Sequence, residues 1–394
     1  MSKPFMFEKP LGMRDTLPSL YEAKKQLKND LSKEIETWGY QFIQTPTLEY
    51  YETIGQASAI LDRQLFKLLD QQGHTIVLRP DMTAPIARVA ASRLLQNRIP
   101  LRLAYETTVF RAQQREAGRP AEFEQMGVEC IGYPSPSADA EMIALLISLL
   151  KQAGLTTFTV TIGHIGFVQK LLLSILGTEK RAATLRKFLY EKNYVGYREH
   201  LLDLSLSSID ESRLMQLLQV KGDKTKLAIA AELVEETGWK ELEQLETLFT
   251  ILESYGVADF VKLDFTLVSH MSYYTGTIFE AYAENVPYPI GNGGRYDQLY
   301  EKFEQPEISA TGFGLYIDRL LEAKGTNEKP HPVHCVIFSK ERIEEALQFT
   351  NVKRNDGERV VMQDITGIQN VDAFTNSYDE VSFFIGKQKE VISQ

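Results

Sequence analysis

The chain has 394 residues, of which 43% are hydrophobic and 24% are charged, a composition that excludes a disordered or fibrous protein. Its formal net charge of −10 disfavours broad binding to nucleic-acid phosphates, because that binding depends on clustered lysine and arginine. The two cysteines and six histidines show no disulfide or metal-ligand spacing, and the sequence has no apolar signal segment or membrane-length apolar run, so we expect a cytoplasmic protein with no metal and no membrane span.

The first quarter of the chain is predicted to contain two helices and two strands. Residues 21–38 carry apolar side chains on one helical face, which predicts an amphipathic helix. Residues 40–45 are typical of a strand that ends at Pro46, because proline cannot donate to a sheet ladder. A short strand at 75–78 then leads through a proline turn into a helix at 84–95.

Two longer strands are predicted at 101–110 and 123–130. They flank the polar segment 111–119, which is a candidate flap over a substrate, because binding loops are often exposed and mobile. Ser137 then precedes a predicted helix at 138–153. Its hydroxyl oxygen can accept a hydrogen bond from the first turn, so we expect Ser137 to cap this helix.

The middle of the chain is dominated by a helical pattern. A strand at 157–162 precedes it, and residues 166–255 show almost no strand alternation, which predicts an inserted helical subdomain. Strands return at 261–267 and 277–282. Residues 291–294 include three glycines, which indicates backbone that passes close to another group or adopts a positive φ.

A polar, proline-containing linker at 326–332 predicts a domain boundary. Because the chain is longer than one hydrophobic core usually organises, we predict a core domain at 1–325 and a small domain at 332–394. The small domain has a strand, helix, strand, helix, strand pattern. Its seven Lys and Arg stand against ten Asp and Glu, so its surface is poorly suited to tRNA.

Seven short motifs, in a fixed order over most of residues 5–322, resemble histidyl-tRNA synthetase. They are Gly12-Met13-Arg14-Asp15, Leu78-Arg79-Pro80-Asp81-Met82-Thr83, Phe110-Arg111, Phe123-Glu124-Gln125-Met126-Gly127-Val128-Glu129, Tyr273-Tyr274, Gly293-Gly294-Arg295-Tyr296-Asp297 and Asp318-Arg319. The resemblance implies an α+β fold, with a class II aminoacyl-tRNA-synthetase-like antiparallel sheet flanked by helices, a helical insertion and a truncated anticodon-binding-like α/β domain. It also implies a dimer built on the first helix and the strand that ends at Pro46.

The same resemblance implies an amino-acid pocket on the sheet. The expected histidine-binding residues are Asp81, Thr83, Arg111, Gln125, Glu129, Tyr273 and Tyr274. Asp81 stands where the family has glutamate, and the oxygen atoms of this set suit an ammonium group and an imidazole N–H. The two tyrosines offer hydroxyls and flat apolar walls. The alternative is that these are ordinary sheet residues whose polar groups satisfy one another.

Departures from the synthetase pattern affect the catalytic and nucleotide-binding positions. Ser269 replaces the arginine that stabilises charge at the reacting phosphate, and losing one such donor typically costs about 100-fold or more in rate. Gln113 replaces the glutamate that holds adenine, Ala121 replaces an arginine, and Tyr316 replaces a glycine where bulk is expected to crowd the base. Two arginines that the resemblance assigns to the nucleotide site remain, Arg111 and Arg319. They either are left from phosphate and adenine binding or persist as structural ion-pair partners.

A retained pocket with lost catalysis resembles the synthetase paralogues that regulate ATP phosphoribosyltransferase. This implies a non-catalytic regulatory subunit without a cofactor, required for the first step of histidine biosynthesis and for its feedback inhibition by histidine. The implied partner is the short-form catalytic subunit HisG, in a hetero-octamer, and no tRNA is expected. Three alternatives stay open: a divergent histidyl-tRNA synthetase, a synthetase-like ligase, and a scaffold that binds no amino acid.

Overall fold

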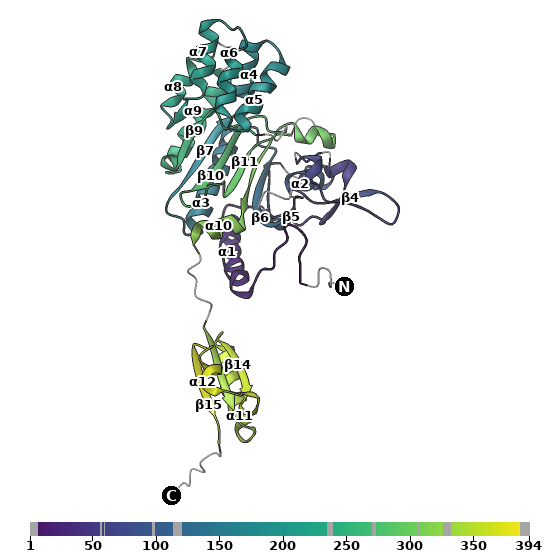
Figure 1. The fold of residues 1–394 in the computed structure, drawn as a ribbon, viewed down its shortest axis with the longest axis vertical. Helices are drawn as coiled ribbons and strands as arrows, with labels where there is room; N and C mark the ends of the chain where they lie inside the picture. The colour runs from purple at the N-terminus through teal and green to yellow at the C-terminus, as the bar shows by residue number, and fades with distance from the viewer. Residues whose placement is uncertain are drawn as a thin grey trace. The chain divides into compact units, whose positions relative to one another are not determined.

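The computed structural model describes residues 7–55, 57–58, 60–96, 99–112, 120–234, 239–269, 273–305, 308–325 and 332–386. The chain divides into two compact units, Met1–Thr326 and Asn327–Gln394, which are described separately (Figure 1). Within the described ranges, no helix is both long enough and apolar enough to cross a membrane.

A nine-stranded mixed sheet forms the centre of the first unit. From one edge to the other its strands are β1 (Gln41–Phe42), β5 (Leu101–Phe110), β6 (Glu122–Ile131), β12 (Ala310–Tyr316), β11 (Gly291–Arg295), β10 (Thr277–Ala283), β7 (Phe158–His164), β9 (Val261–Asp264) and β8 (Lys221–Gly222). The six consecutive strands from β5 to β7 are all antiparallel to one another. At the two ends of this run, β1 pairs with β5 in parallel and β9 pairs with β7 in parallel. The predicted α+β class is therefore confirmed, with parallel pairs added toward the edges.

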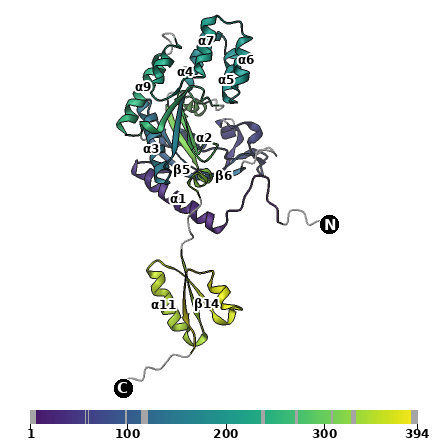
Figure 2. The same ribbon diagram turned by 60° about the vertical axis from the view of Figure 1, so that its left-hand side comes forward.

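One face of this sheet is covered by α1 (Pro18–Thr37), α3 (Pro136–Gln152) and α10 (Ile317–Lys324). Figure 2 shows α1 and α3 on this side and α2 (Thr83–Val89) on the other. The helix α3 is buried almost all round, as expected for a helix rich in Ala, Ile and Leu that packs between a sheet and other helices. The main hydrophobic core therefore lies on the α3 side.

The opposite face of the sheet carries α2 and a second, three-stranded sheet with the order β2-β4-β3. Its strands are β2 (Leu48–Tyr50), β4 (Thr75–Leu78) and β3 (Lys67–Leu69). Because side chains alternate along a strand, β6 points Met126 and Val128 into the main core and Gln125 and Glu129 to the opposite face. Polar residues can therefore gather beside a closely packed core.

The described residues between 166 and 255, which omit 235–238, contain helices and their connections, as predicted, together with the two-residue strand β8. The helices are α4 (Ile165–Leu176), α5 (Glu179–Tyr190), α6 (Tyr194–Leu202), α7 (Ser208–Leu217), α8 (Lys226–Ala231) and α9 (Trp239–Ser254). They are held together by a continuous apolar cluster, and the buried Tyr197 hydroxyl donates to the Leu214 carbonyl at 3.1 Å. The polar end of that tyrosine is thus satisfied inside the helical region.

Four local predictions need correction, and the first is the strand expected at 261–267, which ends at Asp264 with β9. The cap of α3 is Ser135 rather than Ser137, because the Ser135 hydroxyl accepts from the Ser137 N–H and Pro136 already begins the helix. The helix expected at 84–95 is α2 followed by a π-helical segment, Ala90–Leu94. The strand expected at 40–45 is limited to β1. Most of the predicted flap (113–119) and most of the linker (326–331) lie outside the described residues.

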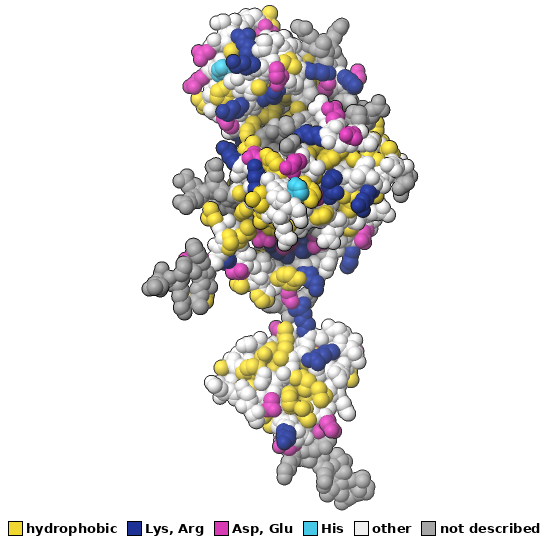
Figure 3. All heavy atoms as spheres, turned by 90° about the vertical axis from the view of Figure 1, so that its right-hand side faces the viewer, with side chains coloured by type: hydrophobic (Ala, Val, Ile, Leu, Met, Phe, Trp, Pro, Cys, Tyr) yellow, Lys and Arg dark blue, Asp and Glu magenta, His cyan; other side chains and the backbone are white. Residues whose placement is uncertain are grey.

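The second unit has the predicted order of strands and helices. These are β13 (Val333–Phe338), α11 (Ile343–Asn355), β14 (Arg359–Asp364), α12 (Val371–Thr375) and β15 (Glu380–Phe384), and the strands form a parallel sheet with the order β14-β13-β15. Its apolar cluster consists of the buried Val336, Ala346 and Val360, with four partly buried side chains packed against them, Phe338, Phe349, Met362 and Phe384. Other large apolar side chains, such as Val352 and Phe383, are exposed, and Figure 3 shows apolar atoms on the surface of this unit.

Candidate functional site

A cavity over β6 and β12, on the face of the sheet opposite α3, brings together every pocket residue expected from the sequence. Those lining residues are Asp81, Thr83, Arg111, Gln125, Glu129, Tyr273 and Tyr274. The walls enclose about 400 Å³ of space between atoms, the open mouth included. The structure therefore joins side chains from four separate stretches of the sequence in one place.

The position of Glu129 and Gln125 depends on glycines in the neighbouring strand. Both side chains point to the same face of β6 and lie against β12. A Cβ atom at Gly312 would collide with the Glu129 carboxylate, and one at Gly314 would collide with the Gln125 amide. These two glycines are needed because polar side chains from β6 occupy the space above them.

Glu129 is 2% exposed and accepts two hydrogen bonds from side chains of the cavity. The Thr83 hydroxyl donates to Oε1 at 2.8 Å, and the Tyr296 hydroxyl donates to Oε2. Burial raises the pKa of the Glu129 carboxyl to about 7, the charge of Asp81 acts in the same direction, and the two hydrogen bonds oppose it. Glu129 therefore changes charge near neutral pH unless a cationic partner stabilises the carboxylate.

Asp81 links the cavity to the start of α2. It follows β4 after a short turn, and its Oδ1 accepts from the Ala84 N–H at 3.1 Å, which satisfies one of the exposed donors in the first turn of α2. The Ser58 hydroxyl donates to its Oδ2. These bonds hold a buried acidic group beside Glu129.

Gln125 offers an unsatisfied acceptor. Its side chain is buried, and among the described residues its Oε1 atom has no hydrogen-bond partner. Leaving a buried polar atom unpaired costs free energy, on the order of 1–3 kcal/mol. A ligand that donates an N–H or O–H to this oxygen would remove that cost.

Aromatic rings form the walls of the cavity. Tyr273 lies 4.9 Å from Tyr274 and 5.7 Å from Tyr296 between ring centroids, in edge-to-face geometry. Burial raises the pKa of Tyr105, Tyr273 and Tyr296 well above the ordinary value, so their hydroxyl groups keep their protons. These rings supply apolar surface with hydrogen-bonding edges.

Sequence reasoning assigned no pocket role to Tyr105, Asn292 or Tyr296, which also line the cavity. Tyr296 belongs to the Gly-Gly-Arg-Tyr-Asp motif, so the motif was a signal that could have found it. The alternation of β5 and β11 does not by itself show which face holds the cavity. That choice depends on how the strands pair.

Arg111 is the basic member of the lining. Its Nε–H donates to the Pro80 carbonyl at 2.8 Å, and its guanidinium carbon lies 5.3 Å from the centroid of the Phe123 ring. The cavity thus combines two buried acids with one oriented cation. A small zwitterion with an extra N–H donor matches this set of groups.

A second cavity lies beside the first and shares Arg111 and Tyr316 with it. The guanidinium carbon of Arg319 lies 4.1 Å from the centroid of the Tyr316 ring, and Phe123 lies 5.7 Å from that ring on a tilted plane. The Tyr316 hydroxyl donates to Asn292 Oδ1 at 2.9 Å, which fixes the ring. Tyr316 therefore contacts both Arg319 and Phe123 within this second cavity.

The other changed positions are placed as follows. Ala121 is fully buried, and Ser269 is partly buried and lines neither of the two cavities. Gln113 lies outside the described residues. Arg319 donates through Nη1 to the Pro289 carbonyl at 2.6 Å and stacks on two tyrosines, which gives it a structural role in this chain.

Family models match nearly the whole chain. The model described as histidyl-tRNA synthetase matches residues 12–320, and the one described as "Histidyl-tRNA synthetase HisZ, C-terminal domain" matches residues 335–386. A protein of Geobacillus sp. (strain WCH70) is 60% identical over 98% of this chain and 99% of its own length, and one of Bacillus subtilis (strain 168) is 56% identical over 98% and 99%. Both are named ATP phosphoribosyltransferase regulatory subunit.

Solved structures give the same picture. A Bacillus halodurans structure titled "ATP phosphoribosyltransferase regulatory subunit/histidyl-tRNA synthetase" is 55% identical, covers 98% of this chain and 100% of its own, and superposes with a TM-score of 0.92. Histidyl-tRNA synthetase from Nostoc sp. PCC 7120 is 21% identical, with coverage of 94% and 88% and a TM-score of 0.79. The second likeness concerns the fold alone.

Proposed function

The chain belongs to the family of ATP phosphoribosyltransferase regulatory subunits, and we propose that the cavity around Glu129 is where it binds histidine. As a member of that family it is a regulatory subunit in histidine biosynthesis rather than an enzyme. Bound histidine is then the feedback signal that this subunit passes to the catalytic subunit.

The observation that carries the proposal is the unpaired, buried Gln125 oxygen beside Glu129. Histidine has an α-ammonium group and an imidazole N–H, both of which need acceptors, and a carboxylate that needs a cation. The cavity supplies acceptors at Asp81, Gln125 and Glu129 and a cation at Arg111. Binding would therefore pair polar groups that are otherwise unsatisfied or costly to ionise.

Contacts in the neighbouring cavity support the absence of adenylate chemistry. Tyr316 is stacked with Arg319 and lies against Phe123, where the synthetase resemblance would put an adenine ring. Removing Tyr316 from these contacts would break its hydrogen bond to Asn292 as well. An adenine ring at this point would have to displace Tyr316 from these contacts, which favours a histidine site without an ATP site.

The proposed partner is the short-form catalytic subunit HisG, in a hetero-octamer located in the cytoplasm. Feedback requires only that histidine bind one arrangement of the complex more tightly than another. The differential affinity, typically about 1–3 kcal/mol, then shifts the population of active complexes. No covalent step takes place on the regulatory chain.

We also propose that the chain forms a dimer with itself through α1 and the β2-β4-β3 sheet. Leu48, Tyr50 and Leu68 are 46%, 53% and 46% exposed on one face of that sheet. Large apolar side chains that gather on one surface favour burial against another protein. The synthetase resemblance implies α1 and the strand that ends at Pro46, and Pro46 lies two residues before β2.

Calorimetric titration of the purified chain tests the histidine site. We expect heat of binding with L-histidine, none with ATP, and weaker binding with histidinol, because histidinol lacks the carboxylate that would pair with Arg111. Absence of histidine binding, both by the chain and by its complex with the catalytic subunit, would refute the proposed site. Tight binding of ATP would instead favour a divergent synthetase.

A further inference from the structure

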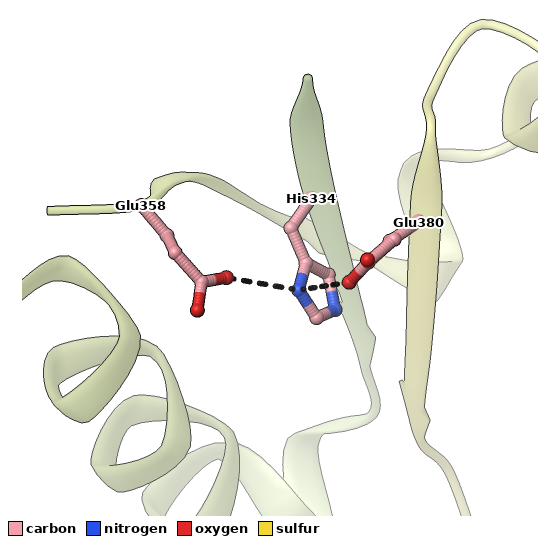
Figure 4. A group of neighbouring side chains, drawn as sticks. All are labelled: His334, Glu358 and Glu380. Atoms are coloured by element: carbon pink, nitrogen blue, oxygen red, sulfur yellow. Dashed lines mark ion pairs between the residues drawn. The ribbon is translucent and has the colours of Figure 1, made fainter. Parts of the chain in front are cut away.

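Three side chains in the second unit form a compact donor set that the histidine site does not involve. One nitrogen or oxygen atom from each of His334, Glu358 and Glu380 lies within 4.8 Å of the other two, and Figure 4 shows the His334 nitrogen paired with both carboxylates. We propose that they bind one divalent transition-metal ion, for which Zn²⁺ is the best chemical match. Imidazole nitrogen with carboxylate oxygen is a common zinc donor set and is poorly suited to Ca²⁺ or Mg²⁺.

The protonation pattern of His334 fits a metal ligand. Its side chain is 7% exposed, its Nδ1 atom is buried, and within the described part of the chain Nδ1 has no hydrogen-bond partner. On the other side of the ring, Nε2 lies 2.9 Å from the Ser382 hydroxyl oxygen. When Nε2–H donates to Ser382, the lone pair of Nδ1 points between the two carboxylates, an arrangement that fixes ring orientation in metal sites.

The distances fit a site that closes slightly on binding. Nδ1 lies 3.4 Å from Glu380 Oε2 and 3.9 Å from Glu358 Oε2. Donor atoms in a tetrahedral zinc site are roughly 3.3 Å apart, given metal–ligand bonds of about 2.0–2.1 Å. Small movements of the two partly exposed glutamates would shorten the distances between donor atoms to this value. Water would take the fourth coordination position.

The fold brings the three donors to one end of the parallel sheet. His334 is in β13 and pairs in register with Glu380 at the start of β15, while Glu358 directly precedes β14. Lys353 donates to Glu358 Oε1 at 2.8 Å, which leaves Oε2 directed at His334. A bound ion would therefore connect all three strands of the sheet.

A metal ion would help a unit that has little hydrophobic core. Its apolar cluster has three buried members and four partly buried ones, and several other large apolar side chains of the unit remain exposed. Domains of this size often need a metal or disulfide in addition to apolar burial. The buried Cys335 is not in a disulfide, so a metal is the cross-link that the unit's residues offer.

The test is titration of the tag-free full-length chain with ZnCl₂ by calorimetry, with MgCl₂ as a parallel titrant. We expect one Zn²⁺ per chain and no Mg²⁺ binding. Glu380→Gln is the main variant, because this side chain is 68% exposed and its replacement leaves the fold intact. Glu380→Gln is expected to weaken Zn²⁺ affinity at least tenfold, and His334→Ala is expected to weaken it at least a hundredfold. Even the mutation of a group that only hydrogen-bonds to a metal ligand lowers metal affinity about 10–100-fold.

The matched control is Glu344→Gln, which makes the same chemical change at an exposed acid on α11 of the same unit. It is expected to keep the wild-type Zn²⁺ affinity. Saturating Zn²⁺ is also expected to raise the melting temperature of the wild-type chain and of Glu344→Gln but not of Glu380→Gln. Equal Zn²⁺ binding by Glu380→Gln and Glu344→Gln, or no binding by the wild-type chain, would overturn the proposal.

Discussion

At the scale of single residues, the charge of the cavity near neutral pH depends on one carboxyl group, which is buried and accepts hydrogen bonds from two hydroxyl groups. Glu129 has a pKa of about 7, so both protonated and ionised forms occur near neutral pH. A ligand that brings an ammonium or imidazolium charge favours the ionised form. The same residue thus connects ligand binding, proton uptake and stability.

Replacing Glu129 with alanine is expected to weaken feedback. The change removes an acceptor for a buried charged or N–H group, which costs roughly 1.5–3 kcal/mol and therefore about tenfold to a hundredfold in histidine affinity. The measurement is the histidine concentration that half-inhibits the reconstituted complex with the catalytic subunit.

The control for this experiment is Glu122→Gln, an exposed acid on the same strand, which is expected to keep the wild-type midpoint. Activation of the catalytic subunit is expected to survive in all variants. If neither Glu129→Ala nor Asp81→Ala changes the histidine concentration for half-inhibition, the cavity does not sense histidine. The function would then be that of an activating scaffold.

The raised pKa of Glu129 also predicts how stability changes with pH. Between the ordinary value of 4.5 and about 7, the folded chain holds a proton that the unfolded chain has lost, so this group makes folding less favourable as pH rises through that range. Glu129→Gln lacks this effect. From pH 5 to pH 8 the wild-type chain is expected to lose stability relative to the variant, on the order of 2–3 kcal/mol.

Denaturant unfolding of the two chains without histidine, at both pH values, measures this difference. Other titrating groups are shared by both proteins and cancel in the comparison. Parallel pH profiles for the wild-type chain and Glu129→Gln would show that the carboxyl does not titrate in this range.

At the scale of elements, β12 determines what each cavity can hold. Its glycines at 312 and 314 leave room for Glu129 and Gln125, and its last residue, Tyr316, fills space on the nucleotide side. One strand therefore lines both cavities, with glycines at the first and the Tyr316 ring at both. Under the proposed function, these residues would allow a synthetase fold to bind histidine without catalysis.

The chain is expected to show no histidine-dependent exchange of pyrophosphate into ATP. Ser269→Arg alone is not expected to restore it, because Tyr316 still occupies its place against Arg319 and Phe123, and Gln113 is unchanged. A bacterial histidyl-tRNA synthetase assayed in parallel provides the positive control. Exchange at synthetase-like rates by either chain would contradict the non-catalytic role.

At the scale of the whole molecule, the chain combines a large unit that contains the proposed histidine site with a small unit that contains the proposed metal site. A dimer built on α1 and the β2-β4-β3 sheet would use the first unit alone. Regulation then requires that histidine binding in this unit alter how the assembly contacts its catalytic partner.

The chain without its partner is expected to be at least dimeric at micromolar concentration. Leu68→Glu places a charge at a 46% exposed apolar position of the proposed interface and is expected to shift the chain toward monomer. Size-exclusion chromatography with light scattering measures the mass. Leu202→Glu is the control, since Leu202 is 62% exposed on α6 in the helical region. A monomeric wild-type chain would exclude this interface.

The sequence by itself determined the class of fold and most elements, because helices and strands have local periods that a linear pattern records. The long helical stretch at 166–255 and the five elements after 332 are examples, as is the ordered series of synthetase motifs. That series also named seven pocket residues that the structure places in one cavity, although histidine binding there stays a proposal.

Only the tertiary structure decided which distant groups share a space and how buried they are. Tyr105, Asn292 and Tyr296 reach the cavity through strand pairing, and the pKa of Glu129 depends on burial that no local pattern reports. His334, Glu358 and Glu380 are likewise more than twenty residues apart and match no ligand spacing, yet parallel strand order brings them together. Such juxtapositions depend on register and packing, which arise from contacts across the whole chain.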